Sequence, residues 1–360
     1  MLWLTELFKG RQLLNEQSRA AIWQSNDTIA QQIKSVQNQL RFLYETLAQE
    51  NDKDKKNKIQ EEIRTVIYKS SLSENVYDKQ YQQPHIDTFI KQIAEISQSK
   101  DIIYWQINDD SNSYVIVINK GIAKIELLNN KDSIQHNTAT FYNNYFFNGP
   151  ELFNNNPQGY FDASAFVLAQ IIPNVNMQNQ DNWLVSKDGF IYGLPIEALT
   201  VQDQYLIEKK SIKSVYTLFN YSDAVYNATE KLHVNIFAKS EHEAPFQDLK
   251  YIDDELKSVS NTVSAKIYKD KAANFEAFQN ALNSPDIMHI STHAIADKEN
   301  QPFIVLDEKI NLDKLEFTLT QSPLVVLSAC ETANGLSING EGLESINRAF
   351  LSKGVKGVIA

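Results

Sequence analysis

The chain has 360 residues, of which 42% are hydrophobic and 22% charged, so it can bury a sizeable core and is not wholly disordered. Its formal net charge of −11 argues against a nucleic-acid partner, because binding phosphates needs a basic surface. The single cysteine excludes an internal disulfide and a zinc site built from several thiolates.

The N-terminal residues carry no sign of export. They lack the basic segment and the long apolar run of a secretion signal. No window approaches the roughly 18–20 apolar residues of a spanning helix. We therefore expect a soluble cytoplasmic protein with no membrane partner.

Residues 1–98 are predicted to be helical, with a helical hairpin at their centre. A first helix is indicated by apolar residues spaced by four and three, which fall on one stripe: Ile29, Ile33, Val36, Leu40, Leu43 and Leu47. A charged turn at 50–56 follows, and apolar positions resume at Ile59, Ile63 and Val66. Such a pair either packs against its own domain or offers a surface for a regulatory partner or for oligomerisation.

From about residue 101 the composition changes to β-branched and aromatic residues, which favour strands. Segments 102–107, 113–118 and 122–128 are predicted to form an antiparallel meander. The following segment, 141–157, is rich in Asn, Phe and Tyr and is expected to be irregular.

A helix over 162–172 precedes a compact motif at 183–199. This motif is predicted to contain a strand, an Asp-Gly turn, a second short strand and a helical turn begun by proline.

The last third alternates strands with helices. Strands are predicted at 234–238, 265–268, 287–291, 324–327 and 355–360, and helices at 251–263, 273–282 and 343–353. This alternation is typical of an α/β domain with a mostly parallel sheet flanked by helices.

Two of these strands end near residues that suit thiolate chemistry. His293 follows the strand at 287–291, and Cys330 follows the strand at 324–327. Parallel strands bring their carboxyl ends to one edge of a sheet, so the two residues can meet there. A histidine can activate a thiol as general base and then protonate a leaving amine.

The residue types alone are also compatible with purely structural roles. A free cysteine is often a buried structural residue, and a lone histidine after a strand is often only a bonded polar group. We place His289, four residues before His293, inside the sheet layers. The spacing of these two histidines occurs in a strand and lacks the helix and nearby Glu of a zinc motif, so no metal or other cofactor is expected.

Several short motifs in a fixed order resemble the CHAT domain, a caspase-like clan CD cysteine peptidase family often associated with tetratricopeptide-type repeats. They are Leu194-Pro195-Ile196-Glu197-Ala198-Leu199, His289-Ile290-Ser291-Thr292-His293-Ala294, Leu327-Ser328-Ala329-Cys330-Glu331-Thr332-Ala333, and Gly340-Glu341-Gly342 with Arg348-Ala349-Phe350 and Gly354 to Ala360. The likeness covers roughly residues 100–360, whereas residues 1–98 match only in being helical.

The resemblance implies a caspase-like hydrolase that cleaves protein substrates through a His–Cys dyad. His293 would be the base and Cys330 the nucleophile, and the backbone N–H groups of Ala294 and Cys330 would hold the oxyanion. Many relatives have glycine at the position of Ala294. The family also implies gating by a helical region or a partner, in bacterial defence or regulated cell death.

In the family the pattern continues after the final strand with a further helix and at least one more strand. We therefore expect residues 100–360 to lack the domain's C-terminal strands. The alternative function is an inactive caspase-like scaffold for protein–protein interaction, and a third is thiol-dependent hydrolysis of a small amide.

Overall fold

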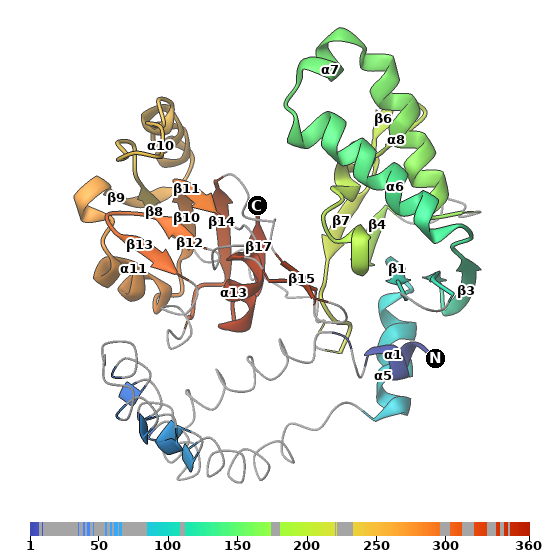
Figure 1. Ribbon diagram of the computed structural model, residues 1–360, viewed down its shortest axis with the longest axis horizontal. Coiled ribbons are helices and arrows are strands. Elements are labelled where there is room, and N and C mark those ends of the chain that lie inside the picture. Colours follow the sequence, from blue (N-terminus) through green and yellow to red (C-terminus); the bar gives the residue numbers. More distant parts are fainter. Residues whose placement is uncertain are drawn as a thin grey trace.

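Two five-stranded sheets organise the chain (Figure 1). The computed structural model describes residues 1–6, 9, 85–108, 112–173, 181–219, 221, 233–295, 303–311, 320–329, 336–338, 342–344 and 346–360, with scattered residues between 35 and 66. Within these residues, no helix is long and apolar enough to cross a membrane.

The first sheet has the order β3-β2-β1-β4-β7. Its strands are β1 (Asp101–Gln106), β2 (Tyr114–Asn119), β3 (Ile122–Leu127), β4 (Asn182–Ser186) and β7 (Ser211–Ser214). The pairs β1–β2 and β2–β3 are antiparallel, which confirms the predicted meander. The pairs β1–β4 and β4–β7 are parallel.

The central strand β1 is buried on both faces of this sheet. Ile103 and Trp105 belong to a core with helices α6 (Lys131–Tyr142) and α8 (Pro157–Ile171). Ile102 and Tyr104 face a second core with α1 (Leu2–Glu6) and α5 (Ile86–Ile96). Such two-sided burial explains the nearly continuous apolar sequence of β1.

The segment expected to be irregular, 141–157, is instead mostly helical. It contains the end of α6, a π-helical turn η1 (Asn143–Phe147), α7 (Glu151–Asn155) and the start of α8. The ring of Tyr160 lies 5.4 Å from Phe141 and 5.0 Å from Tyr145, measured between centroids. This aromatic packing outweighs the low helix propensity of the asparagines, which made the prediction wrong.

The short second strand predicted near residue 190 is also wrong. Gly189–Ile191 forms a 3-10 turn, η2. Gly189 has φ +50°, and a Cβ there would lie 2.8 Å from the Ile107 side chain, so only glycine fits this close turn. The carboxylate of Asp188 accepts a hydrogen bond from the Ile107 N–H at 2.7 Å, and this bond holds the turn in place. The predicted helical turn after Pro195 is confirmed as η3 (Ile196–Ala198).

Beyond η3, β5 (Thr200–Val201) and β6 (Gln204–Tyr205) form a small hairpin, and α9 (Leu206–Lys209) leads into β7.

The second sheet is wholly parallel and has the order β17-β14-β10-β8-β9. Its strands are β8 (His233–Ala238), β9 (Ser264–Lys269), β10 (Ile287–Ser291), β14 (Leu324–Ser328) and β17 (Gly357–Ile359). Helices cover both faces, so the predicted mostly parallel sheet flanked by helices is confirmed.

Helix α10 (Ile252–Thr262) lies on one face of this sheet, where Ile252 and Leu256 pack with β8. Helices α11 (Phe275–Leu282) and α13 (Ile346–Ser352) lie on the other face, where Phe278 and Phe350 share a core with β10 and β14. A 3-10 turn, η4 (Asp270–Ala272), follows β9.

Two small antiparallel sheets complete this half. One joins β11 (His293–Ile295), β12 (Phe303–Val305) and β13 (Lys309–Asn311). The other joins β15 (Leu336–Ile338) and β16 (Gly342–Glu344). Strand pairing in β16 takes residues assigned by sequence to the start of a helix, so α13 begins at Ile346 rather than Leu343.

Most of the predicted N-terminal hairpin lies outside the described residues. Among those described, Leu43, Ile63 and Val66 are buried together, with Ile59 against them. The hairpin and the division of the chain at about residue 98 remain predictions.

Candidate active site

The strand order of the second sheet reverses between β8 and β10. From β8 the chain passes to β9 on one side and then to β10, β14 and β17 on the other. Ligands of open α/β sheets bind at the carboxyl ends of the strands beside such a reversal. The segments that follow β8 and β10 are therefore the first place to look for a site.

His293 lies directly after β10, but in a different strand. β10 ends at Ser291, Thr292 bonds through its hydroxyl to the Val305 carbonyl, and β11 begins at His293. The strand does not run through from His289 to His293, so the two imidazoles have separate surroundings.

The His293 imidazole is held by the segment that follows β8. Its Nε2 lies 2.6 Å from the carbonyl oxygen of Gln247. A carbonyl can only accept a hydrogen bond, so Nε2 carries the proton in this contact. In the neutral ring, Nδ1 is then the nitrogen with the free lone pair, which is the one able to take a proton.

Two aromatic rings fix the plane of the His293 imidazole. Phe246 stacks on it at 5.3 Å between centroids and 29° between planes. His242 meets it edge-on at 4.5 Å and 70°. Rings at these separations attract through dispersion and their quadrupoles, so the segment after β8 sets both the tautomer and the orientation of His293.

The surroundings of His242 favour the uncharged state of its own imidazole. Its Nε2 contacts the carbonyl oxygen of Lys239 at 3.0 Å. Burial lowers the pKa of His242, the Lys239 carbonyl opposes this, and the neighbouring His293 and Lys239 lower it further. A neutral His242 places no positive charge beside the His293 ring.

A second polar group lies beneath the carboxyl ends of β10 and β14. Glu255 of α10 accepts from His289 Nε2 at 2.7 Å through one oxygen, and from the Ser291 hydroxyl at 2.6 Å through the other. His289 is largely buried, with 12% of its side chain exposed. This position inside the layers confirms the prediction for His289.

The Glu255 carboxylate is kept ionised by its partners. Burial raises its pKa, but hydrogen bonds from Ser291, Ser328 and His289 and the charge interaction with His289 outweigh this, so the pKa is lowered. Because Ser291 and Ser328 end neighbouring strands, one carboxylate ties both strand ends to α10.

The register of β10 and β14 places the two sequence motifs side by side. Ser291 and Ser328 are direct partners in this parallel pair. His293 and Cys330 each follow two residues later. Cys330 itself lies outside the described residues. Ala294 is buried in β11 opposite Ile304.

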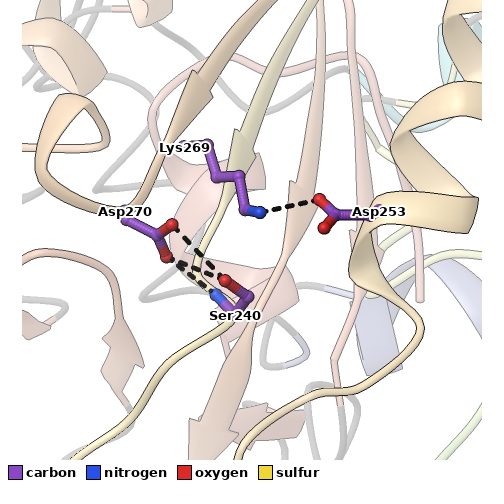
Figure 2. A network of polar contacts seen from close by, with 4 residues as sticks. All are labelled: Ser240, Asp253, Lys269 and Asp270. Carbon is purple, nitrogen blue, oxygen red and sulfur yellow. Dashed lines mark hydrogen bonds and ion pairs between the residues drawn. The ribbon is translucent and has the colours of Figure 1, made fainter.

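A polar network links the ends of β8 and β9 to α10 (Figure 2). Asp270 accepts from the backbone N–H of Ser240 at 3.0 Å and from its hydroxyl at 3.1 Å. Lys269 reaches Asp253 at 2.7 Å. Burial opposes but does not cancel the effect of the Ser240 bonds, and the pKa of Asp270 is lowered. The network fixes the start of the segment that carries His242, Phe246 and Gln247.

Sequence reasoning missed Glu255, His242, Phe246 and Gln247. Glu255 had a usable signal, because it lies beside the buried Ile252–Leu256 stripe of an amphipathic helix. The Gln247 contact had none, since a backbone carbonyl is common to every residue type. Within the described part of the chain, no group of three or more His, Cys, Asp or Glu residues is placed to bind a metal.

The family described as CHAT domain matches residues 164–360, which is more than half of the chain. No curated protein matches. The matched range contains all of the second sheet, both motif histidines and the single cysteine.

Proposed function

The chain belongs to the CHAT-domain family, a caspase-like, peptidase-related family, and on that premise we propose that it is a cysteine endopeptidase. Cys330 is the proposed nucleophile and His293 the proposed base. The substrates are protein chains, as the family relationship suggests.

The observation that carries this proposal is the register of β10 and β14. Ser291 and Ser328 are paired, and neighbouring strands lie about 4.8 Å apart. His293 lies two residues after Ser291, and Cys330 lies two residues after Ser328. The segments that carry His293 and Cys330 therefore leave neighbouring strands at the same register position, which supports pairing these two residues.

The state of His293 also supports the assignment. Its Nε2 is engaged by the Gln247 carbonyl, so Nδ1 is the nitrogen left for proton transfer. A general base needs both a fixed orientation and a free lone pair. The contacts with Phe246 and Gln247 fix the orientation of the ring, and the tautomer leaves the lone pair on Nδ1.

In the proposed reaction, His293 Nδ1 takes the thiol proton and the Cys330 sulfur attacks the scissile carbonyl carbon. The N–H groups of Ala294 and Cys330 stabilise the oxyanion. The C–N bond breaks as the imidazolium gives its proton to the leaving amine. Water, deprotonated by His293, then attacks the thioester, and the carboxylic acid product leaves with the thiol restored.

We also infer that the N-terminal residues predicted to be helical bind a regulatory protein that gates this activity in the cytoplasm. This inference rests on the apolar stripe that includes Val36 and Leu40. A charged residue at either position should uncouple gating while leaving Cys330 reactive. An inactive scaffold would behave differently, because Cys330→Ala would then leave its cellular effect intact.

The test is incubation of the protein with a cellular proteome, followed by mass spectrometry of new N-termini. We expect a consistent set of cleavage sites with wild type and none with Cys330→Ala or His293→Ala. The same cleavage pattern from all three proteins would refute the proposal.

A further inference from the structure

Strand β3 forms an unusually exposed edge of the first sheet. It pairs with β2 on its inner side, and no strand lies along its outer side within the described residues. Its apolar residues Ile122, Ile125 and Leu127 are 67%, 52% and 51% exposed. Folded proteins usually protect such edges, because the free N–H and C=O groups invite pairing with another strand.

The side chains of β3 alternate between two faces, and the apolar Ile122 shares a face with the charged Lys124 and Glu126. Ile125 is the register partner of Ile116, which belongs to the core beneath α5. Since side chains alternate along a strand, Ala123, Ile125 and Leu127 share that face. Lys124 and Glu126 lie on the other face, on either side of Ile125 along the strand.

This sequence is self-complementary when read antiparallel, and we propose that β3 pairs with β3 of a second copy about a two-fold axis at Ile125. Lys124 of each copy then faces Glu126 of the other. Ile125 faces Ile125, and Ala123 faces Leu127. Contacts of this kind, repeated by symmetry, are the mark of an isologous dimer interface, and the two sheets become one continuous sheet.

Charge selects this register over its neighbours. Two directly opposed residues in an antiparallel pair either both direct their backbone N–H and C=O groups toward the partner strand or both direct them away from it. The allowed registers therefore differ by a shift of the axis by one residue. An axis at Lys124 opposes two lysines, and an axis at Glu126 opposes two glutamates. Of these three axes, only the one at Ile125 opposes unlike charges, and like charges directly opposed destabilise a sheet.

A second copy is the occupant that these residues favour. One short strand supplies both members of each charge pair and both sides of the apolar contact. A different partner would need to present the same pattern by coincidence. The proposal concerns the first sheet alone, and does not depend on the peptidase activity.

The first test is the oligomeric state of the full chain by sedimentation equilibrium over about 1–100 µM. We expect a reversible dimer in wild type. Lys124→Glu or Glu126→Lys should weaken it by about tenfold or more, because each change alters both symmetric pairs. The double variant Lys124→Glu/Glu126→Lys should restore it. Circular dichroism confirms that each variant is folded.

A matched control comes from the other sheet. Lys266→Glu reverses a charge on β9, an edge strand of the second sheet, and should leave the dimer unchanged. A monomer at every concentration, or a dimer weakened by Lys266→Glu and not by Lys124→Glu, would overturn the proposal.

The register has its own test in a Cys330→Ala background. Ile125→Cys brings two thiols together across the axis, so a short bismaleimide should link the copies. Ile122→Cys places them about 20 Å apart along the strands and should not link. Equal linking at both positions, or linking at Ile122→Cys alone, contradicts the proposed axis.

Discussion

The carboxylate of Glu255 lies 2.7 Å from His289 Nε2, and this contact joins α10 to the strand that leads to the proposed catalytic base. The same carboxylate accepts from Ser291, two residues before His293. Glu255 therefore acts as a positioning residue beneath the edge of the sheet where the chemistry is proposed.

Glu255→Gln should destabilise the protein by about 1–2 kcal/mol at neutral pH, since one oxygen acceptor becomes an amide donor facing another donor. Because the pKa of Glu255 is lowered from its ordinary value of 4.5, the ionised carboxylate stabilises the folded protein above about pH 4.5. This stabilisation is lost as the pH falls below that value. Urea unfolding at several pH values should show the two proteins converging in acid. Asp254→Asn, at an exposed neighbouring position, is the control and should stay within about 0.5 kcal/mol of wild type.

Phe246→Ala should lower kcat by about two- to tenfold, the effect of losing an aromatic pair worth about 0.5–1.5 kcal/mol. KM should hardly change, because Phe246 orients His293 and is not proposed to touch substrate. Phe246→Tyr keeps the ring and should restore kcat. An effect on KM alone would assign Phe246 to substrate binding instead.

His242→Gln should flatten the pH dependence of stability. The pKa of His242 is lowered from 6.5, so the unfolded chain binds this proton more readily than the folded one. Wild type carries no penalty well above pH 6.5 and a growing penalty as pH falls below it. The groups that face His242 are His293, Lys239 and Asp248, and all remain in the variant.

Unfolding measured between about pH 5 and 8 tests this difference. His136→Gln changes an exposed histidine on α6 and should keep the wild-type slope. If His242→Gln also kept that slope, the charge state inferred for His242 would be wrong.

Two contacts drawn in Figure 2 should contribute differently to the stability of the protein. Asp270→Ala removes the acceptor of both Ser240 bonds and should cost about 1 kcal/mol. Asp253→Ala removes an exposed ion pair with Lys269 and should cost less than about 0.5 kcal/mol. Thermal unfolding of the two variants gives the ranking, and the reverse order would contradict it.

The parallel sheet could be predicted because its inner strands β8, β10 and β14 are short, mostly apolar runs between segments with helical periodicity. The ends of β10 and β14 could be predicted for the same reason. The helices within 141–157 could not, since they depend on Tyr160 packing against rings that precede it in the chain.

The candidate site was only half visible in the sequence. His293 and Cys330 stand out through residue type and position after strands. The contacts that orient His293 could not be predicted, because Gln247 acts through its main chain and Phe246 and His242 come from a segment 46 to 51 residues away. Tertiary contacts of this kind leave no periodic signal.

The most direct measurement is the rate at which an electrophilic peptide ketone modifies Cys330, with the adduct located by mass spectrometry. We expect rapid modification of wild type at Cys330 alone and modification at least about a hundredfold slower in His293→Ala. Equal rates in wild type and His293→Ala would show that His293 does not activate the thiol, and a label that persists in Cys330→Ala would show that Cys330 is not the nucleophile.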